Sequence, residues 1–448
     1  MSNENSESEL SQFLSKMNKL ARLASTVDPK SLFDFLTKMN PETVAKLMKM
    51  ASSQKKRPLP MIDGDFYSVS EKLTPEERDI QLRVRAFMHE HIEPIADECW
   101  IKAEFPYHVI PKLASLEVAG LTYNGYTCPG RRSVLEGVIA MEMARVDTSF
   151  STFFGVQSGL AMGSIYYCGS EEQKNEYLPR MRKFELLGAF GLTEPDVGSG
   201  AAMGLTTTCK REGDEWVING QKKWIGNATF SDFTVIWARD LDDDQVKGFI
   251  VDSKTPGFEA VKIEDKLSLR TVQNAEITLK DCRVPEAKRL QNANSFKDTS
   301  KVLRMTRAGV AWQAVGCARG AYEAALGYAQ TRKQFGKPIG SFQLIQDQLA
   351  QMLSGLTAMQ TMVMRLSELQ DEGKLKDEHA SLSKVFCTKT CREIVSFARS
   401  IHGGNGILLN RDVGRFLADA EALYSYEGTK EINSLIVGRA VTGFSAFV

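Results

Sequence analysis

The strongest constraint on the fold is one long stretch of helical periodicity, FQLIQDQLAQMLSGLTAMQTMVMRLSELQ, at residues 342–370. Its apolar side chains recur every three or four residues over roughly seven to eight helical turns. A helix of this length must bury its apolar stripe against other helices, and long antiparallel helices joined by short loops predict a bundle. The apolar positions are Leu344, Ile345, Leu349, Met352, Leu353, Leu356, Met359, Val363 and Leu366.

The sequence pattern changes twice along the chain, from helical to β-rich and back to helical. Helical patterns begin at LTPEERDIQL, where Thr74 and Pro75 form a cap and a first helical residue. Short β-rich runs follow, and the Asn219-Gly220 pair between two of them predicts a hairpin turn. We therefore expect an α+β, mainly α fold in four parts: a helical extension and linker (1–60), a helical domain (61–187), a β domain (188–295) and a helical bundle (296–448).

The N-terminal extension contains two helix starts, at Asp28 and Asn40, each followed by proline. The favoured interpretation is a small helical appendage that packs on the main body or on a neighbouring subunit. A membrane-touching amphipathic hairpin is the weaker alternative, because the polar face of these helices is not strongly basic.

Charge and cysteine content exclude several classes of protein. The 56 basic and 56 acidic residues cancel, so no global field predicts binding to nucleic acid or to a membrane surface. No apolar run reaches the ~18 residues of a membrane span. The N-terminus is acidic, whereas secretory and mitochondrial presequences begin basic, and the C-terminal FSAFV does not resemble a peroxisomal signal. These two features predict a cytoplasmic location. The eight cysteines form no CxxC pair, and Cys387 and Cys391 lack a nearby histidine pair, so no metal site is expected.

Four glycine-containing phrases are the candidates for a functional site: GAFGLTEPDVGSG (188–200), KKWIGN (222–227), IHGGNG (401–406) and YSYEGTKEIN (424–433). None matches a dinucleotide or P-loop fingerprint. Taken singly, each has an ordinary structural interpretation. IHGGNG suits a helix C-cap, KKWIGN suits a strand with a buried tryptophan, and Glu427 suits the first turn of a helix.

The order and separation of these phrases favour a functional interpretation. Together with RKQFGKPI (332–339), they resemble the motif series of the acyl-CoA dehydrogenase family, over a span from Leu73 to Val448. EMARVDTSF, GSEEQKNEYLP and LGAFGLTEP are most similar to the glutaryl-CoA dehydrogenase branch and to plant short-chain acyl-CoA oxidases. The resemblance implies an N-terminal helical domain, a central β-barrel-like domain and a C-terminal four-helix bundle, with FAD held between them.

The resemblance also implies which residues bind the cofactor and the substrate. The 190–199 segment would line the flavin through backbone amides and hydroxyls, and Trp224 and Ile225 would pack at its ring. Arg332 and Gln343 would reach FAD from a neighbouring subunit, which implies a homotetramer, and Arg307 would face the CoA part. The cofactor-binding set is Phe190, Leu192, Thr193, Gly198, Ser199, Trp224, Ile225, Gly226, Arg332, Gln343, Gly403, Gly404, Thr429 and Glu431, and the substrate-binding set is Ser151, Thr152, Ser199, Arg307 and Gly428.

Glu427 corresponds to the catalytic base of the family. It would remove an α-proton from the acyl thioester while flavin N5 accepts the β-hydrogen as hydride, which gives a trans-2-enoyl-CoA. The amide of the base and a ribityl hydroxyl would stabilise the enolate. Gly428 would leave room for the acyl chain.

Two departures from the family pattern narrow the prediction. Ser151 stands where glutaryl-CoA dehydrogenases have an arginine for the distal carboxylate. A neutral serine disfavours glutaryl-CoA and favours short or medium monocarboxylic acyl-CoA. Most dehydrogenases of the family have a threonine or serine near flavin N5 where this chain has Gly226, and the plant oxidases share its loss. Two interpretations stay open. The substitution is neutral, or it lets reduced flavin react faster with oxygen.

The leading hypothesis is therefore an acyl-CoA dehydrogenase of fatty acid β-oxidation that passes electrons to an electron-transferring flavoprotein. The alternative that shares most of this chemistry is an acyl-CoA oxidase that makes hydrogen peroxide. A non-catalytic acyl-CoA-binding protein is a third alternative, and the presence of Glu427, Arg332 and the flavin loops argues against it.

Overall fold

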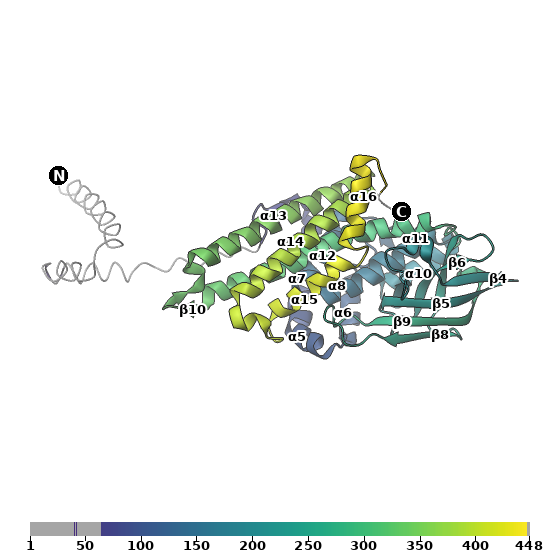
Figure 1. Cartoon of the computed structure of the whole chain (residues 1–448), viewed down its shortest axis with the longest axis horizontal. Helices are drawn as coiled ribbons and strands as arrows, with labels where there is room; N and C mark the ends of the chain where they lie inside the picture. The colour runs from purple at the N-terminus through teal and green to yellow at the C-terminus, as the bar shows by residue number, and fades with distance from the viewer. Residues whose placement is uncertain (1–39, 41, 43–63, 446–448) are drawn as a thin grey trace. The chain divides into compact units, whose positions relative to one another are not determined.

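The computed structural model describes residues 40, 42 and 64–445 (Figure 1). The chain divides into two compact units, residues 1–61 and residues 62–448. In the first unit, the expected cap at Asp28 lies outside the described residues. At the other expected cap, the side chain of Asn40 accepts a hydrogen bond from the amide of Glu42 at 2.9 Å, as an Asx cap does.

The second unit opens with helices, and the first long one begins at the predicted cap. The Glu77 amide donates to Thr74 Oγ1 at 3.3 Å, and the Thr74 amide donates to Glu77 Oε2 at 2.9 Å, which is a capping box. This part contains α4 (Pro75–Phe87), α5 (Glu93–Lys102), α6 (Ile110–Ala114), α7 (Ser133–Val146), α8 (Thr148–Phe154), α9 (Met162–Cys168) and α10 (Glu171–Arg182), the π-helical segments η2 (Met88–Ile92) and η4 (Gly155–Ala161), the 3-10 turns η1 (Val69–Lys72) and η3 (Tyr107–Val109), and a small hairpin of β1 (Asn124–Gly125) and β2 (Cys128–Pro129).

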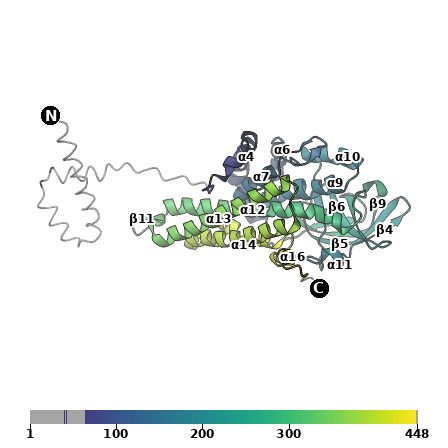
Figure 2. The ribbon, with the colours of Figure 1, turned by 90° about the horizontal axis from the view of Figure 1, so that it is seen from above.

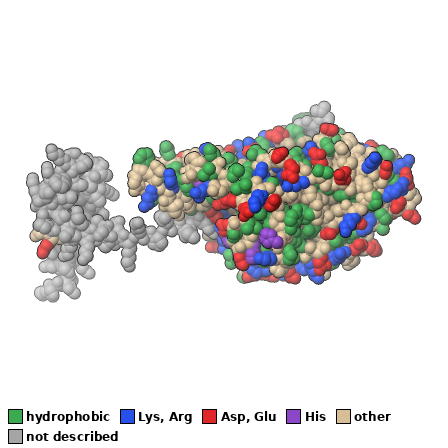
Figure 3. Space-filling view, turned by 90° about the horizontal axis from the view of Figure 1, so that it is seen from below, with side chains coloured by type: hydrophobic (Ala, Val, Ile, Leu, Met, Phe, Trp, Pro, Cys, Tyr) green, Lys and Arg blue, Asp and Glu red, His purple; other side chains and the backbone are tan. Residues whose placement is uncertain are grey.

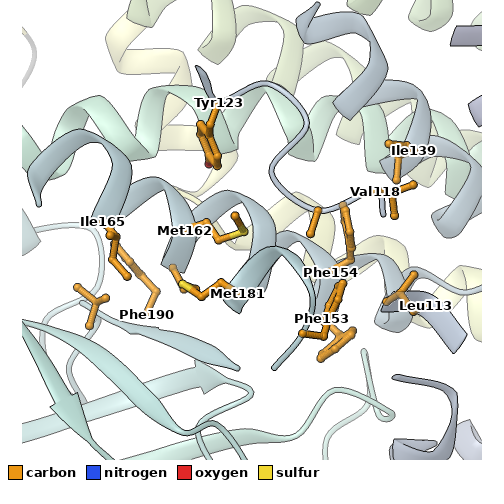
Figure 4. Close-up of a cluster of buried hydrophobic side chains, with 14 of the residues drawn as sticks. Leu113, Val118, Tyr123, Ile139, Phe153, Phe154, Met162, Ile165, Met181 and Phe190 are labelled. Atoms are coloured by element: carbon orange, nitrogen blue, oxygen red, sulfur yellow. The ribbon is translucent and has the colours of Figure 1, made fainter. Parts of the chain in front are cut away.

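A large apolar cluster fills the space between these helices and the β-sheet. Phe153 and Phe154 of α8, Met162 of α9 and Phe190 of β3 belong to it, each 8% exposed or less (Figure 4). Because α8, η4 and α9 follow one another with a single π-helical interruption, they cross this core as one helical rod. The rod therefore has neighbours on both the helical and the β side of the molecule.

The middle part is a curled mixed sheet of seven strands in the order β3-β6-β4-β5-β9-β8, with β7 paired to β6 outside this path. β3 and β4 each run parallel to β6, and the other pairs are antiparallel. The strands are β3 (Gly188–Gly191), β4 (Thr208–Glu212), β5 (Glu215–Gly226), β6 (Phe233–Asp240), β7 (Val246–Asp252), β8 (Phe258–Lys262) and β9 (Asn274–Pro285), with the short helix α11 (Ala201–Gly204) between β3 and β4 and the turn η5 (Glu286–Lys288) after β9.

The predicted hairpin turn at Asn219-Gly220 is wrong. Both residues lie inside β5, at a register shift between Ile218 and Gly220. Gly220 has φ +146°, and a Cβ there would lie 2.6 Å from Thr207 Cα, so glycine allows a close approach at a bulge. The Asn219 side chain instead exchanges hydrogen bonds with the amide and carboxylate of Asp281 on β9, at 2.8 and 3.2 Å.

The last part is helical, as the long periodic stretch predicted. α12 (Phe296–Thr331), α13 (Gln343–Asp371) and α14 (Asp377–Ile401) lie side by side in both ribbon views (Figures 1 and 2), followed by α15 (Asp412–Ser425) and α16 (Lys430–Thr442). Five residues of the predicted stripe, Met352, Leu356, Met359, Val363 and Leu366, are at most 3% exposed. Leu344 departs from the prediction at 78% exposed, because it lies in the first turn of α13. A small hairpin of β10 (Lys333–Gln334) and β11 (Lys337–Pro338) and the turn η6 (Ile339–Ser341) connect α12 to α13, and η7 (Gly403–Ile407) follows α14.

Glycines bring α7 and α12 unusually close together. A Cβ on Gly316 would lie 2.3 Å from the carbonyl oxygen of Met141, and one on Gly137 would lie 2.2 Å from Nε1 of Trp312. Backbone contact of this kind fixes the two helices against each other with little freedom to slide. Residues on α7 and residues on α12 are therefore held in a defined relation.

Candidate active site

Glu427 lies in the turn that connects α15 to α16. It has φ +54° and Gly428 has φ +82°, so two successive residues adopt the left-handed conformation. Thr429 then caps α16, its hydroxyl accepting from the Ile432 amide at 3.3 Å. Glu427 therefore precedes the cap by two residues, and the first-turn acid of α16 is Glu431. The interpretation of Glu427 as a first-turn helix residue is wrong.

The Glu427 carboxylate points into the protein. Thr306 of α12 donates its hydroxyl to Glu427 Oε2 at 3.0 Å. Burial raises the pKa of Glu427, while the charges of Arg307 and Lys384 and the Thr306 hydrogen bond oppose that rise. A left-handed glutamate in a part-buried position with a raised pKa is the arrangement expected of a proton acceptor, since strain and perturbed pKa values concentrate at functional sites.

Lys384 of α14 donates hydrogen bonds to backbone carbonyl groups at the turn that contains Glu427. Its ammonium group is fully buried and donates to the carbonyl oxygen of Gly428 and, at 3.3 Å, to that of Tyr424. Burial lowers the pKa of Lys384 to about 8, although the charge of Glu427 opposes this. Lys384 was not among the residues predicted from the sequence. The sequence feature that could have identified it is a lysine among the small and apolar residues of the buried face of α14, such as Ala380, Cys387 and Cys391.

A chain of hydrogen bonds connects Tyr426, the residue before Glu427, to Ser151. The Tyr426 hydroxyl donates to Gln313 Oε1 at 2.5 Å, and Gln313 Nε2 donates to Ser151 Oγ at 3.2 Å. Ser151 Oγ donates to the carbonyl oxygen of Ala140, and Thr152 Oγ1 donates to that of Thr148. Ser151 and Thr152 are therefore buried and engaged. Gln313, which connects Ser151 to Tyr426, was not among the predicted residues.

The β-sheet brings two of the glycine-containing phrases together. The Lys223 amide donates to the carbonyl oxygen of Thr193 at 2.8 Å, so the segment after β3 runs beside the end of β5. Phe190 and Leu192 are buried and Thr193 is part-exposed. Gly198 and Ser199, further along the segment, lie exposed before α11.

Trp224 presents its indole to solvent from a strained backbone. It is 53% exposed with φ +65°, and its neighbour Ile225 is 2% exposed. The interpretation of this phrase as a strand with a buried tryptophan is therefore wrong. A large aromatic ring held outward in a rare conformation fits the flat face of an aromatic ligand.

Gly226 and Asn227 connect this strand end to the helical rod. A Cβ on Gly226 would lie 3.1 Å from Cγ2 of Val156 on η4. Asn227 Nδ2 donates to the carbonyl oxygen of Phe153 at 3.2 Å. The rod of α8 and η4 thus contacts the Trp224 strand on one side and, through Ser151 and Gln313, the turn of Glu427 on the other.

A buried ion pair stabilises the segment between Thr193 and α11. Lys222 Nζ lies 2.9 Å from Glu194 Oε1, with both side chains at most 1% exposed. Glu194 also accepts from the amide and hydroxyl of Thr206 and from the amide of Thr207, at 2.7 to 2.9 Å. Burial alone would raise the pKa of Glu194, but Lys222 and these donors lower it to about 2.

Replacing Glu194 by glutamine is expected to destabilise the β domain by about 3–5 kcal/mol, because it leaves the Lys222 ammonium buried without its partner. The wild-type contribution is fully present above the ordinary carboxyl pKa and is lost as the pH falls from about 4 toward 2. Denaturant unfolding followed by tryptophan fluorescence measures both effects. Glu212→Gln, at a half-exposed pair with Arg283, is the control, and equal losses in the two variants would contradict this assignment.

A second group of predicted residues lines a cavity of about 890 Å³ where α12 and α14 end and α13 begins. Arg332, Gln343, Gly403 and Gly404 all border it. A Cβ on either glycine would meet no atom within 4 Å. His402 stacks on Tyr328 with ring centroids 4.2 Å apart and is engaged in packing.

Helix length separates this cavity from Glu427. Thr306, beside Glu427, and Arg332, at the end of α12, are 26 residues apart on one helix, which corresponds to roughly 39 Å at 1.5 Å per residue. The structure therefore brings the predicted cofactor residues together as two separate groups.

Arg307, next to Thr306 on α12, has a donor that is available to a ligand. Its Nε is buried without a hydrogen-bond partner among the described residues, and its charge lowers the pKa of Glu427. A buried guanidinium donor without a partner suits an anionic or carbonyl group of a bound molecule.

The described part of the chain contains no helix long and apolar enough to cross a membrane. Among the same residues, no group of three or more histidine, cysteine or acidic side chains could hold a metal ion. Acidic and basic side chains are interspersed on the face shown in Figure 3.

Three family models match this chain in sequence order. They are the acyl-CoA dehydrogenase N-terminal domain (74–185), middle domain (189–282) and C-terminal domain (296–442). The matches cover the helical, β and helical parts described above.

Individual relatives and a solved structure agree with the family models. The probable acyl-CoA dehydrogenase YngJ of Bacillus subtilis (strain 168) is 34% identical over 374 residues, 82% of this chain and 98% of that protein. The caffeyl-CoA reductase–Etf complex subunit CarC of Acetobacterium woodii is 34% identical over 348 residues, 77% of this chain and 92% of that one. The glutaryl-CoA dehydrogenase of Mycobacterium smegmatis, solved in complex with FADH2, superposes with a TM-score of 0.83 at 36% identity and covers 86% of this chain and 99% of that one. This chain belongs to the acyl-CoA dehydrogenase family, whose members are oxidoreductases.

Proposed function

We propose that this protein catalyses the FAD-dependent α,β-dehydrogenation of a short- or medium-chain acyl-CoA to the trans-2-enoyl-CoA. The observation that carries the proposal is the position of Glu427, a part-buried left-handed carboxylate whose pKa is raised by burial. An α-proton of a thioester is weakly acidic, so its removal requires a carboxylate held at that carbon and shielded from water.

The residues around Glu427 prepare it for this task. Thr306 fixes the orientation of the carboxylate through the 3.0 Å hydrogen bond, and Lys384 holds the carbonyl of Gly428. Gly428 has no side chain that would crowd the substrate. By resemblance to the family, the amide of Glu427 donates to the thioester oxygen, where enolate charge develops.

The residues present fit FAD. Trp224 offers an exposed aromatic face, and the glycines at 403 and 404 leave open space in the 890 Å³ cavity beside Arg332. When bound, FAD supplies a flavin ring that accepts the β-hydrogen of the substrate as hydride. Thr193, Ser199, Ile225, Thr429 and Glu431 are proposed to line it.

The separation of the two cofactor groups supports a cofactor site shared between subunits. Trp224 and Thr193 are proposed to hold the flavin of their own subunit, while Arg332 and Gln343 serve the cofactor of a neighbour. This arrangement needs at least a dimer and suits the homotetramer expected from the family resemblance. The proposed electron acceptor is an electron-transferring flavoprotein, as the name of the Acetobacterium relative suggests.

Ser151 argues against glutaryl-CoA as the substrate. Its hydroxyl is buried and engaged by Gln313 and Ala140, so no cation stands at this position for a distal carboxylate. We therefore expect butyryl-CoA or hexanoyl-CoA to bleach the flavin of the purified yellow protein under anaerobic conditions, and glutaryl-CoA to do so far more slowly. Bleaching by glutaryl-CoA at an equal rate would contradict this assignment. Purified protein without FAD absorbance would support a binding protein instead.

Gly226 favours a second candidate function, an acyl-CoA oxidase that passes electrons to oxygen. We expect Gly226→Ser to lower the peroxide formed per enoyl-CoA in air by several fold, because a hydroxyl at this position would hinder the reaction of reduced flavin with oxygen. The new Cβ would be only 3.1 Å from Val156, so the substitution requires a small shift of that side chain. Oxygen-electrode and peroxide assays without an added acceptor measure the effect.

Gly438→Ser, at an open helical position of α16 where a Cβ meets no atom within 4 Å, is the control for that comparison. Wild-type peroxide release that matches enoyl-CoA formation would establish the oxidase. Negligible peroxide release by the wild type would leave the dehydrogenase with an electron-transferring flavoprotein as its acceptor.

A further inference from the structure

Asn274, the first residue of β9, holds the backbone of Trp224. Its Nδ2 donates to the carbonyl oxygen of Trp224 at 3.2 Å, and Asn274 is also the ladder partner of Gly226. Trp224 lies within a register shift of β5 against β9, between Lys222 and Ile225, where a bulge interrupts the regular ladder. The Asn274 side chain therefore substitutes for a ladder hydrogen bond at the residue whose indole turns outward.

Lys266 fixes the orientation of that amide. Its ammonium group donates to Oδ1 of Asn274 at 2.6 Å, and to the carbonyl oxygens of Leu269 and Val272 at 2.8 and 2.6 Å. Because an ammonium group is only a donor, it requires the oxygen of the Asn274 amide on its own side and directs Nδ2 toward Trp224. Without Lys266 the amide could turn, and the Trp224 carbonyl would lose a fixed donor.

Lys266 belongs to a loop, residues 263–273, that is itself held firmly between β8 and β9. The Leu269 amide donates to Asp419 Oδ1 at 2.7 Å, and Leu269 has the left-handed φ of +47°. Asp419 is fully buried on α15, the helix that precedes the Glu427 turn, and Trp100 Nε1 donates to the same oxygen at 3.1 Å. The loop therefore gives Lys266 a rigid base.

Anchoring of the loop does not by itself explain Lys266. Arg270 and Gln273, from the same loop, already donate to backbone carbonyl oxygens at the end of α5, at 2.9 to 3.1 Å. Burial lowers the pKa of Lys266 to about 8, and the charge of Asp419 opposes that fall, so the position disfavours a charged lysine. Among the described residues, no carboxylate forms an ion pair with Lys266, and its three acceptors are neutral. What Lys266 adds to the loop is the contact with Asn274.

We propose that Lys266 is a positioning residue that, through Asn274, holds the indole of Trp224 against the flavin ring. The inference rests on the proposed function, which places Trp224 at the flavin. Lys266 acts through the backbone of Trp224, whose left-handed conformation persists only while its surroundings hold it. When the Trp224 carbonyl loses its donor, the residue relaxes toward an ordinary conformation and carries the indole away from the ring.

The flavin fluorescence of the holoenzyme, measured per bound FAD and without substrate, reports the position of the indole. An indole in contact with a flavin quenches its emission by electron transfer, and this quenching falls steeply with distance. We expect Trp224→Phe to raise the emission several-fold, and Lys266→Met to raise it in the same direction because the indole withdraws. Unchanged emission in either variant would overturn the proposal.

Asn274→Asp separates a role in position from a role in stability. The new carboxylate still accepts from Lys266 and forms an ion pair with it, but it has no N–H to donate to the Trp224 carbonyl. We therefore expect a folded variant, with a denaturant midpoint no lower than that of the wild type, whose flavin emission rises as in Lys266→Met. Wild-type emission in Asn274→Asp would overturn the proposal, and this variant also provides the test where Lys266→Met does not fold.

Lys262→Met is the matched control. Lys262 also donates to a backbone carbonyl oxygen, that of Ala103, at 3.1 Å, and its side chain is 28% exposed and pairs with Glu264. Among the described residues, the Lys262 side chain forms no hydrogen bond with Asn274. It should leave the flavin emission at the wild-type level, and a rise equal to that of Lys266→Met would overturn the assignment to Lys266.

Three outcomes separate failure of this inference from failure of the proposed function. If the purified protein holds no FAD, both are wrong. If acyl-CoA does not bleach the flavin but the emission of the variants changes as expected, the proposed reaction is wrong and the role of Lys266 stands. If acyl-CoA bleaches the flavin but the variants emit as the wild type does, only the role of Lys266 is wrong.

Discussion

Replacing Glu427 by glutamine is expected to lower the rate of substrate-dependent flavin bleaching by about 10³-fold, with little change in substrate binding. The amide keeps the shape of the side chain and can still accept from Thr306, but it cannot take a proton from carbon. General base catalysis of this kind contributes about 10² to 10⁴ in rate. Anaerobic stopped-flow absorbance at the flavin band measures the rate directly.

The control for this variant is Glu421→Gln. Glu421 lies on α15, the helix that leads into the turn, and its half-exposed carboxylate pairs with Arg392 at 2.8 Å. It should bleach at the wild-type rate. If Glu427→Gln also bleaches at the wild-type rate, the proton acceptor is another residue and the proposed mechanism is wrong.

Replacing Lys384 by methionine is expected to have the second largest effect, a loss of about 10²-fold in kcat. The variant removes the ammonium that donates to the carbonyl oxygens of Gly428 and Tyr424 and leaves both without that donor. The left-handed turn then loses a constraint, and a misplacement of about 1 Å at a reacting group can cost this much in rate. Methionine fills a similar volume and keeps the core packed.

The pH profile distinguishes a role at the base from a general loss of stability. Lys384 and Arg307 lower the pKa of Glu427, against the rise that burial causes. Loss of one of these charges should raise that pKa further, and Glu427 acts only when it is deprotonated. The rising limb of the kcat profile should therefore move to higher pH in Lys384→Met.

Lys389→Met is the matched control, because Lys389 lies on the same helix, is 67% exposed and only approaches Glu393 at 3.8 Å. It should retain both the wild-type rate and the wild-type pH profile. A lower rate in Lys384→Met with an unchanged profile would show that Lys384 acts only through the fold.

The order of the elements could be predicted from local patterns in the sequence. The main catalytic candidate could be predicted only from the order of motifs that lie far apart. Helical periodicity is a local property, so α13 could be predicted from its own residues. The helix start at Thr74 and Pro75 could be predicted because these residue types favour a helix cap and a first helical position. Glu427 could not be assigned from its own segment, where it resembles an ordinary helix residue. Its assignment depended on the order of distant motifs, and the structure places it in a left-handed turn before the helix.

The errors share one physical cause, which is tertiary context. Asn219 and Gly220 have the local chemistry of a hairpin, but pairing of β5 with both β4 and β9 draws them into a bulged strand. Trp224 has the local pattern of a core residue, but the strand end turns its backbone outward. Lys384 and Gln313 were not predicted as site residues because their importance lies in partners that are 44 and 113 residues away in the chain.

The π-helical segment η4 has a consequence for how this protein can change over evolutionary time. Val156 at its start touches the strand end of Gly226, and Gly159 within it faces Thr306 and Glu136. Each residue of an α-helix turns the chain by about 100°, so a one-residue deletion or insertion ahead of α9 would turn the side chains of that helix away from their partners. We expect the length of residues 155–161 to be inherited unchanged where surface loops vary, since a one-residue insertion or deletion would disturb the contacts at Val156 and at Gly159 together.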